Sequence, residues 1–573
     1  MATQPQPNAR LLPSQRKLDE AVVRVREAAP AFARLALADR IALARSMRAG
    51  YLRIAERSVR AACAAKGIRL GTPAEGEEWG TGPWCVVRQL RLLIESLCSL
   101  ERNGNTPIGA MRPTADGRVA VRVFPANAID GMLFSGITVD VRMRAGVDEA
   151  AVRDTRASFY KRPTHAGRTV LVLGAGNLAA IPAMDVLTKL FNEGKVCVLK
   201  MNPVNAYLAP FIEEAFVDAI AAGYLAVVYG GTDEGGYLAH HPGIDEVHLT
   251  GSDKTYDAIV WGPPCPERDA RKACGAPVLA KPVTAELGNV SPVLVMPWNY
   301  SEKELAFQAE SIAGAVTHNA SFNCNAAKML VLPKGWSRRG ELLAGIERAL
   351  AAAPLRQAYY PGAADRWRAL TGGRSEVRTI GAAAEGALPW TLLPGLDASN
   401  ASEPAFSTEP FCAILSETSV GSDDPIEFLE RAVTFANDRL WGTLAADLVV
   451  HPKALKDPRL SEAVERGIAR LRYGAVTVNS WSGFVFACGT PPWGAFPGST
   501  PADIQSGTGW AHNTPMLEGI EKAVLRHPIT LMPKPATFPS HRTAHALLRR
   551  ITYLDEQAKW SKVPGVVAAA MRG

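Results

Sequence analysis

Short apolar runs alternate with glycine turns and helical segments between residues 168 and 252, and this alternation limits the fold more than any other feature of the chain. The first run, TVLVL, is apolar throughout, as expected for a parallel strand buried on both faces. Strands are predicted at 169–173, 196–200, 225–229 and 246–249, and helices at 181–191 and 209–222. The pattern predicts βαβ units and a doubly wound α/β sheet, which binds ligands at the carboxyl ends of its strands.

A second alternating pattern begins near residue 287 and predicts a second α/β domain. Its strands are predicted at 293–296, 329–332, 411–415, 444–450 and 475–478, and its helices at 302–316, 339–352 and 426–436. Ahead of both patterns, residues 14–100 repeat apolar side chains at helical spacing, which predicts several amphipathic helices. Residues 119–140 are rich in β-branched and aromatic side chains, which predicts strands or a hairpin.

Composition and charge limit the class of protein. The chain has 573 residues, 47% of them hydrophobic and 21% charged, which is enough core for about two to four domains. The net charge of +7 is not concentrated in long runs, which argues against a nucleic-acid partner. The nine cysteines are irregularly spaced without a CxxC pair, so we expect a reducing compartment and neither disulfides nor a metal site. No stretch is typical of a signal peptide or a membrane span, and a cytoplasmic enzyme is therefore expected.

One cysteine stands where a polar loop meets a predicted strand. The polar residues of 318–323 lead into Cys324, after which the chain becomes small and apolar and enters the strand 329–332. A thiol at such a junction can be held rigidly while its sulfur faces a cleft, as a nucleophilic cysteine requires. Taken alone, the residue is more often explained as a packed thiol, because free cysteine is among the most buried residue types.

Three polar residues beside predicted strands are further candidates. Asn177 ends a glycine turn after the first strand, where its amide can donate to a developing oxyanion, although such a turn also serves simply to reverse the chain. Glu286 lies in an apolar stretch, where burial would raise the pKa of a general base; a salt-bridged carboxylate is the alternative. Glu409 precedes a strand and is either a carboxylate that holds ribose hydroxyls or a surface acid.

Several features follow one another in a set order along the chain. They are a Gly-Asn turn at 176–177, Lys200 at the end of the next strand, Thr-Gly-Ser at 250–252, Glu-Leu-Gly at 286–288, an asparagine-containing loop before Cys324, Glu-Pro-Phe at 409–411, GAVTVN at 474–479 and PWGAFPGS at 492–499. In order and approximate spacing, this set resembles the aldehyde dehydrogenase superfamily over roughly residues 120–510. The resemblance implies an aldehyde-dehydrogenase-like fold of two doubly wound α/β domains with a β-strand oligomerisation arm.

The resemblance also implies an activity, the oxidation of an aldehyde to a carboxylic acid with NAD or NADP. Cys324 matches the thiolate that attacks the aldehyde, and the thiohemiacetal becomes a thioester when hydride leaves for the nicotinamide. Asn177 matches the amide that stabilises the oxyanion together with the backbone N–H of Cys324. Glu286 matches the base that activates water to release the acid.

Five residues match the cofactor contacts of the family. Lys200 matches the lysine at the ribose hydroxyls, Gly251 and Ser252 the turn at the pyrophosphate, Glu409 the acid on the nicotinamide ribose, and Phe411 the aromatic that seats the nicotinamide ring. Members that prefer NAD place an acid where this chain has Pro203. Because that acid would repel a 2′-phosphate, its absence leaves both NAD and NADP open.

Two departures from the family pattern keep other functions open. Ser321 and Phe322 stand where the family has Gly-Gln, and Asn289 replaces the second glycine of Leu-Gly-Gly. A coenzyme-A-acylating aldehyde dehydrogenase, or acyl-CoA reductase, is therefore one alternative, although such members commonly lack the glutamate present at 286. A non-catalytic scaffold with the same fold is the other.

The motifs divide the chain into parts. We expect an NAD(P)-binding domain at 1–118 and 162–286, a catalytic thiol domain at 287–494, a strand arm for oligomerisation at 119–161, and a C-terminal tail at 495–573 that packs on the other domains. The insertion at 261–282 is expected to be a solvated loop. Trp481, Phe484, Phe486 and Trp493 either line an apolar tunnel or pack in the core. The expected assembly is a homodimer or homotetramer acting on a small aldehyde.

Overall fold

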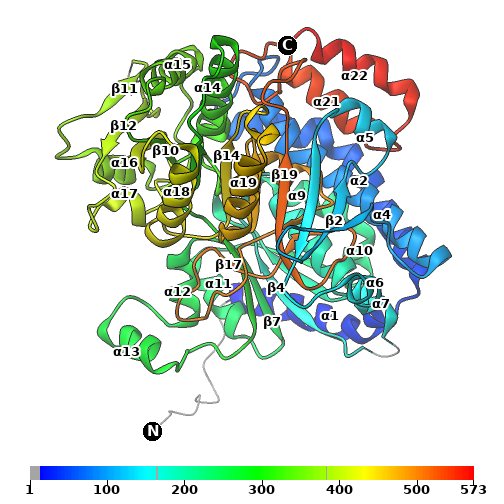
Figure 1. Ribbon diagram of the computed structural model, residues 1–573. Helices are drawn as coiled ribbons and strands as arrows, with labels where there is room; N and C mark the ends of the chain where they lie inside the picture. The colour runs from blue at the N-terminus through cyan, green and yellow to red at the C-terminus, as the bar shows by residue number, and fades with distance from the viewer. Residues whose placement is uncertain (1–12, 163–164, 383) are drawn as a thin grey trace.

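The computed structural model describes residues 13–162, 165–382 and 384–573, and it consists of two large β-sheets with helices packed on them (Figure 1). The first residues of the expected cofactor domain, 1–12, lie outside the described part. None of the helices in the described ranges is both long enough and apolar enough to cross a membrane. The mixed architecture confirms the predicted α/β fold class.

The smaller sheet has six strands in the order β17-β8-β7-β4-β5-β6. Its parallel strands are β4 (Thr169–Leu173), β5 (Val196–Lys200), β6 (Leu225–Val228), β7 (Glu246–Gly251) and β8 (Val283–Leu287), and β17 (Gly507–Thr508) pairs antiparallel with β8. The chain moves outwards from β4 to β6 and then returns to place β7 and β8 on the other side of β4. The order therefore reverses between β4 and β7, which is where open sheets of this kind bind ligands.

Helices connect and cover this sheet. They are α8 (Ile181–Leu187), η2 (Thr188–Asn192), η3 (Pro203–Leu208), α9 (Ala209–Ala215), α10 (Val217–Ala221), α11 (Thr232–His240), α12 (Asp253–Val260) and α13 (Pro266–Cys274). The four strands and two helices predicted from the sequence are confirmed, with the second helix split into α9 and α10 at Phe216.

The insertion at 261–282 is not only a loop, so that expectation was wrong. It contains α13, which begins with a proline and stops at Gly275 in the left-handed conformation. Lys272 of α13 forms an ion pair with Asp257 of α12, with a 2.9 Å separation between amino and carboxyl groups. The helix buries none of its side chains, which explains why its sequence carries no apolar periodicity.

The predicted amphipathic helices precede the sheet in sequence and pack beside it. They are α1 (Pro13–Ala33), α2 (Leu37–Ala65), α3 (Glu75–Trp79), the π-helical turn η1 (Gly80–Trp84) and α4 (Cys85–Asn103). Two arginines of α4 are buried: Arg88 pairs with Asp130 and Asp555, and Arg91 pairs with Asp555. These ion pairs tie the N-terminal helices to the strand arm and to the C-terminal part of the chain.

The larger sheet has eleven strands in the order β1-β2-β3-β19-β15-β14-β9-β10-β13-β12-β11. They are β1 (Met111–Pro113), β2 (Val119–Phe124), β3 (Thr138–Met143), β9 (Pro292–Val295), β10 (Met329–Pro333), β11 (Arg378–Ile380), β12 (Trp390–Leu396), β13 (Ile414–Val420), β14 (Ala445–Val449), β15 (Ala475–Val478) and β19 (Ile520–Arg526). Its larger helices are α14 (Glu302–Thr317), α15 (Arg339–Ala352), α16 (Ala363–Thr371), α18 (Pro425–Arg439) and α19 (Pro458–Arg470). The second predicted α/β pattern is confirmed, although the strand expected at 411–415 begins later, at Ile414.

The shorter elements complete the chain between these strands and helices. They are α5 (Ala128–Leu133), α6 (Glu149–Thr155), α7 (Ser158–Lys161), η4 (His318–Ser321), α17 (Pro404–Ser407), η5 (Ala454–Lys456), α20 (Gly483–Cys488), β16 (Pro492–Trp493) and β18 (Ala511–His512). The strands predicted at 119–140 are present as β2 and β3 and pair antiparallel, but α5 connects them in place of a tight turn.

A strand from the expected C-terminal tail lies in the middle of the larger sheet. Strand β19 pairs in parallel with β15 and antiparallel with β3, so it joins the strand arm to the catalytic half of the same chain. The buried Lys522 of β19 donates to the main-chain oxygens of Ile468, Ala469 and Leu471 at the end of α19. The arm is thus paired within the chain, and its joining of subunits stays a prediction.

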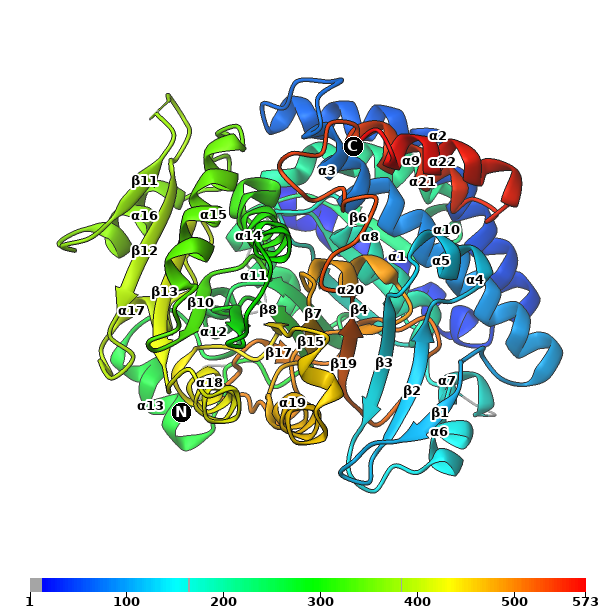
Figure 2. The same ribbon diagram turned by 45° about the horizontal axis from the view of Figure 1, so that its top comes forward.

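The remainder of the chain forms a helical layer over the N-terminal helices. Helices α21 (Ala544–Leu554) and α22 (Val563–Ala570), linked by η6 (Trp560–Lys562), follow an extended stretch after β19. Helix α21 packs on α3 and η1, and Figure 2 shows this red segment lying beside α2 and α3. The Trp84 indole donates to Asp555 at 2.6 Å, which anchors the end of α21.

Candidate active site

The carboxyl edge of the smaller sheet gathers most of the sequence candidates. Asn177 follows β4, Lys200 ends β5, Gly251 ends β7 and Glu286 lies near the end of β8. Cys324 comes from the other sheet, in the loop between α14 and β10. The structure therefore brings residues from two sheets together at the site that the strand order of the smaller sheet favours.

The loop before Cys324 has an unusual backbone. Asn319, Ala320 and Ser321 have φ values of 53°, 54° and 69°, so three consecutive residues other than glycine are left-handed. Such residues cost on the order of 1–3 kcal/mol each and persist only where the surroundings fix them. Ser321 stands where the family has glycine, and the structure shows that the position does require the conformation that glycine adopts freely.

A buried polar network holds this loop. The amino group of Lys66 donates to Glu78 at 2.9 Å, to the Asn319 side-chain oxygen at 3.0 Å and to the main-chain oxygen of Asn177 at 3.2 Å. The hydroxyl of Tyr359 donates to the same two oxygens of Asn319 and Asn177, at 2.9 Å each. Because Lys66 and Glu78 are both buried, this network fixes the loop against α2, α3 and the turn after β4.

The thiol of Cys324 lies against the carboxyl group of Glu286. Cys324 is partly exposed and faces a cavity, whereas Glu286 is buried. Burial, reinforced by the Glu286 carboxyl, raises the pKa of the thiol well above its ordinary value. Burial, followed by the charge of Asp185, raises the pKa of Glu286 to about 7, while hydrogen bonds from Cys324 and the Trp493 indole act in the opposite direction. The arrangement can pass a proton from sulfur to carboxylate near neutral pH.

One oxygen of that carboxyl group is free for another partner. Glu286 Oε1 is buried and has no hydrogen bond of standard geometry to any described residue. The indole Nε1 of Trp493 likewise makes no hydrogen bond of standard geometry, although it lies near enough to the Glu286 carboxyl group to lower its pKa. Buried polar atoms are normally paired, so these two are exceptions among the described residues.

Lys328 is a member of the site that sequence reasoning missed. Its buried amino group donates to the main-chain oxygens of Cys324 at 2.7 Å and of Asn289 at 2.9 Å, and it forms an ion pair with Glu409. Its charge lowers the pKa of the Cys324 thiol, against the larger effect of burial. The available signal was a single lysine in the otherwise small and apolar run that leads into β10.

The residue that departs from the family pattern after Glu286 supports the main chain. Asn289 is buried; its amide donates to the Ala445 main-chain oxygen at 2.9 Å and its side-chain oxygen accepts from Ser291 at 2.7 Å. A side chain at the preceding Gly288 would collide with the carboxylate of Glu409. The departure at 289 therefore ties the β8–β9 connection to β14 and leaves the space beside Glu409 unchanged.

Asn177 reaches the loop before Cys324, where its side-chain amide already donates one hydrogen bond. The side-chain nitrogen donates to the main-chain oxygen of Phe322 at 2.9 Å. This bond consumes one amide hydrogen and leaves the second available. The structure thus places Asn177 beside the segment that carries Cys324, and its role at an oxyanion stays a prediction.

The expected cofactor residues of the smaller sheet face its carboxyl edge. Lys200 is only 7% exposed, and its amino group has neither a hydrogen bond nor an ion pair among the described residues. Burial lowers the pKa of Lys200, and the charge of Glu234 opposes this shift. Ser252 caps α12 by accepting from the Thr255 N–H at 3.2 Å, so the helix begins at the edge where an anion would be bound.

The two expected nicotinamide contacts lie on one loop before β13. Arg366 holds this loop by donating to the main-chain oxygens of Pro410 and Phe411, at 3.0 Å each. The backbone of Phe411 is left-handed, with a φ of 40°, and its ring contacts the ring of Phe322 in the loop before Cys324. Glu409 is occupied by its ion pair with Lys328. The loop is therefore fixed independently of any ligand.

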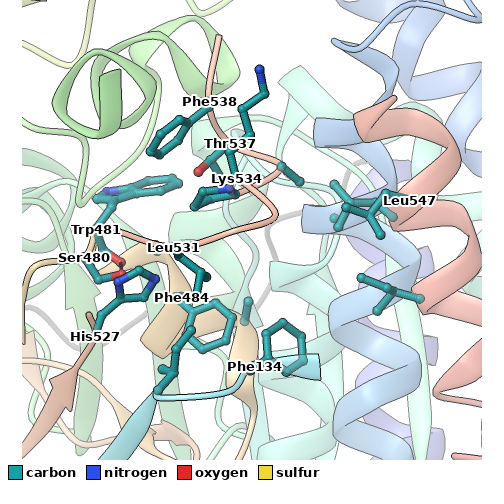
Figure 3. A pocket seen from close by; sticks show the side chains of 18 of the residues that line it. Phe134, Ser480, Trp481, Phe484, His527, Leu531, Lys534, Thr537, Phe538 and Leu547 are labelled. Carbon is teal, nitrogen blue, oxygen red and sulfur yellow. Dashed lines mark hydrogen bonds between the residues drawn. The ribbon is translucent and has the colours of Figure 1, made fainter. Parts of the chain in front are cut away.

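A cavity of about 400 Å³ opens beside Cys324. Trp481, Phe484, Phe486 and Trp493 all line it, and Phe486 and Trp493 are also buried in the core, so both interpretations of these aromatic residues hold in part. Figure 3 shows Trp481 on one side of the cavity and Leu547 of α21 on the other, with Leu531, Phe484 and Phe134 between them. Its volume lies in the range of ligand-binding cavities, about 300–1,000 Å³.

Comparisons with known proteins agree with this geometry. Residues 151–355 match the aldehyde dehydrogenase family. The chain is similar to an indole-3-acetaldehyde dehydrogenase in complex with NAD+, with 20% identity, 89% of each chain covered and a TM-score of 0.59. It is similar to the aldehyde dehydrogenase KauB from Pseudomonas aeruginosa to the same extent, with 20% identity, 89% of each chain and a TM-score of 0.59. It is also similar to NADP-dependent glyceraldehyde-3-phosphate dehydrogenase from Bacillus halodurans C-125 complexed with NADP, with 16% identity, 89% of this chain, 91% of that chain and a TM-score of 0.57.

At these identities the solved structures show the fold, and the matched segment adds the family signature across β4 to α15. Residues 151–355 therefore carry the match to the aldehyde dehydrogenase family, and the chain as a whole shares the fold of these solved structures.

Proposed function

We propose that this protein oxidises an aldehyde to a carboxylic acid with NAD or NADP. The observation that carries the proposal is the contact between the Cys324 thiol and a Glu286 carboxyl group whose pKa is about 7 and whose other oxygen is unpartnered. A nucleophile and a base whose pKa lies near neutral pH are what the two half-reactions require of the protein.

The first half-reaction uses the sulfur and the carboxylate. Glu286 accepts the proton of the Cys324 thiol, and the sulfur attacks the aldehyde carbon, forming a C–S bond while the carbonyl π electrons move to oxygen. The backbone N–H of Cys324 and the second amide hydrogen of Asn177 donate to that oxygen. A bound nicotinamide would supply the hydride acceptor that converts the thiohemiacetal into a thioester, which Cys324 holds.

The second half-reaction releases the acid. Glu286, after returning its first proton to solvent, takes a proton from a water held at its unpartnered oxygen. The water oxygen attacks the thioester carbon, the C–S bond breaks and the sulfur leaves as a thiolate that is reprotonated. Glu286 therefore supports hydrolysis over transfer of the acyl group to coenzyme A.

The residues present fit a nicotinamide dinucleotide. Lys200 is buried and has no hydrogen-bond partner among the described residues, so it is available for ribose hydroxyls, and Gly251 and Ser252 stand at a helix N-terminus that could bind a pyrophosphate. Glu409 would hold the nicotinamide ribose and Phe411 would seat the ring. We assign the cofactor to the smaller sheet with residues 1–118 and 162–286, the thiol to 287–494, and contacts between subunits to the arm at 119–161, in a homodimer or homotetramer.

The test is product analysis with the purified chain. We expect aldehyde-dependent reduction of NAD or NADP and acid formed without coenzyme A, and a loss of more than about a thousandfold in kcat for Cys324→Ala. Cys274→Ala, which removes an exposed thiol on α13, is the matched control and should retain full activity. Turnover only with coenzyme A would favour the acylating alternative, and full activity in Cys324→Ala would overturn the proposal.

A further inference from the structure

The part of the chain that follows β19 forms the outer wall of the cavity beside Cys324. Residues 531–538 supply one portion of its lining, and α21 and α22 supply another through Leu547, Leu548, Ile551, Val566 and Val567. These helices are held against the rest of the protein by the buried pairs of Arg88 and Arg91 with Asp555. The segment is therefore a fixed outer wall of the cavity. The Cys324 thiol lies at the inner end of that cavity.

The lining of this cavity does not favour a substrate whose tail is charged. Within the described ranges no arginine, aspartate or glutamate lines it, and the single lining lysine, Lys534, directs its amino group to Ser540, at 2.8 Å and 3.0 Å from its two oxygens. Burial lowers the pKa of His318 and of His527, which favours the neutral form of both lining histidines. An anionic group drawn into such a space would lose its hydration without gaining a counterion.

The apolar lining continues to the protein surface. Met132, Met532 and Val567 all line the cavity, yet they are 43%, 75% and 40% exposed. Apolar side chains exposed together around one opening, unlike single ones scattered over a surface, are typical of a ligand or partner site. These residues lie at the open end of a cavity that starts at Cys324. A hydrocarbon chain bound to the thiol would therefore make apolar contacts along its length to the protein surface.

We propose that the C-terminal segment, residues 527–570, is the outer wall of the substrate site and selects uncharged aldehydes that carry a long hydrocarbon tail. The proposal rests on the function proposed above and adds the substrate class. The inner wall, with Trp481, Phe484 and Phe134, grips the first carbons of the tail, and the C-terminal residues bind the carbons beyond.

The first experiment is a chain-length series with the wild-type protein. From propanal to dodecanal we expect kcat/KM to rise by about threefold to fourfold for each methylene group until the cavity is filled, because each buried methylene contributes about 0.8 kcal/mol. Glyceraldehyde 3-phosphate and succinic semialdehyde should fall at least about a hundredfold below octanal. A profile that is flat with length, or a charged aldehyde that is the best substrate, would overturn the proposal.

A matched pair of variants at α22 and directly after it tests the outer wall itself. Val567→Asp places a charge in the lining at a half-exposed position. Met571→Asp places one at a 63% exposed position directly after the helix, where the residue does not line the cavity. We expect the dodecanal-to-propanal ratio of kcat/KM to fall about tenfold in Val567→Asp and to stay unchanged in Met571→Asp. Equal ratios in the two variants would contradict the assignment of the wall.

Binding separates this inference from the proposed function. Dodecanol is uncharged and cannot be oxidised through a thiohemiacetal, so its binding, measured by calorimetry, does not depend on turnover. We expect the wild-type protein to bind dodecanol and Val567→Asp to bind it about tenfold more weakly. If no aldehyde is oxidised but dodecanol binds in this way, the proposed function fails and the apolar site stands; if dodecanol does not bind, the site fails.

Discussion

The two sides of Cys324 differ in polarity, because one consists of ionisable groups and the other of apolar side chains. On one side lie three ionisable groups, the buried Glu286 and Lys328 and the largely buried Glu409, carried by β8, by the residue before β10 and by the loop before β13. On the other side the C-terminal segment contributes almost only hydrocarbon. The charged side is fixed by central strands and the apolar side by a peripheral helical layer. The groups that perform the reaction can therefore stay constant while the groups that choose the aldehyde are exchanged.

The largest effect is expected from the charged side, at Glu286. Glu286→Gln should lower kcat by about a hundredfold to ten-thousandfold, because the amide cannot accept a proton from sulfur or water. In the wild-type protein activity should rise as the pH passes about 7, since the carboxyl group with that pKa must lose its proton before it acts as a base. This rise should be absent in the variant. A pH–rate profile from pH 5.5 to 9 measures both, and an unchanged rise would assign it to another group.

Lys328→Met should be the next most damaging change. It leaves the largely buried Glu409 without its partner and removes the donor to two main-chain oxygens, so we expect a loss of about 3–5 kcal/mol in the free energy of unfolding. Denaturant unfolding measures this loss. The double variant Lys328→Met/Glu409→Gln should recover part of it, because the uncompensated charge is then gone. A double variant that is less stable than Lys328→Met would show that the charge pair is not what Lys328 supports.

A smaller effect is expected where the two sides meet, at Trp493. The Trp493 indole lowers the pKa of Glu286, and Trp493→Phe removes the N–H while keeping a ring in the cavity. The pKa of Glu286 should therefore rise above about 7, and activity at pH 7 should fall by about twofold to tenfold while activity at pH 9 is retained. An activity loss that is the same at every pH would show that the ring's shape matters and its N–H does not.

The smallest effect is expected on the apolar side, at Lys534. Its amino group is bonded to Ser540 and points away from the cavity, so Lys534→Gln should change kcat/KM for an uncharged aldehyde by less than about twofold. The same assay with succinic semialdehyde should remain weak in both proteins. If Lys534→Gln lowered activity selectively with that anionic aldehyde, the comparison between a charged and an uncharged side would fail.

The sequence predicted the parts of the fold that are set locally. Buried parallel strands such as β4 and β10 are apolar at every position, and glycine turns separate them from their helices, so the α/β alternation could be recognised without tertiary information. The site residues were reached through the resemblance, and the structure brings Cys324, Glu286 and Asn177 together. Their individual roles remain proposals.

The missed features depend on partners that are distant in the sequence. Strand β19 contains Glu521 and Lys522, which look unsuitable for the middle of a sheet. Glu521 is paired with Arg118 and Arg142 of the arm, and Lys522 caps the end of α19, so both charges are satisfied only after folding. Lys328 is a similar case, because its partner Glu409 lies on another strand connection. Helix α13 was missed for a different reason, since it packs no apolar face.

The place of β19 also has a consequence for the making of the protein. Residues 520–526 of a 573-residue chain separate strands formed from residues 138–143 and 475–478. Until the ribosome has released this stretch, β3 and β15 each keep one edge without a partner, and such edges bind other strands readily. A nascent or truncated chain that ends before residue 520 therefore exposes two unpaired strand edges that are prone to aggregation. In the complete protein the single strand β19 covers both edges.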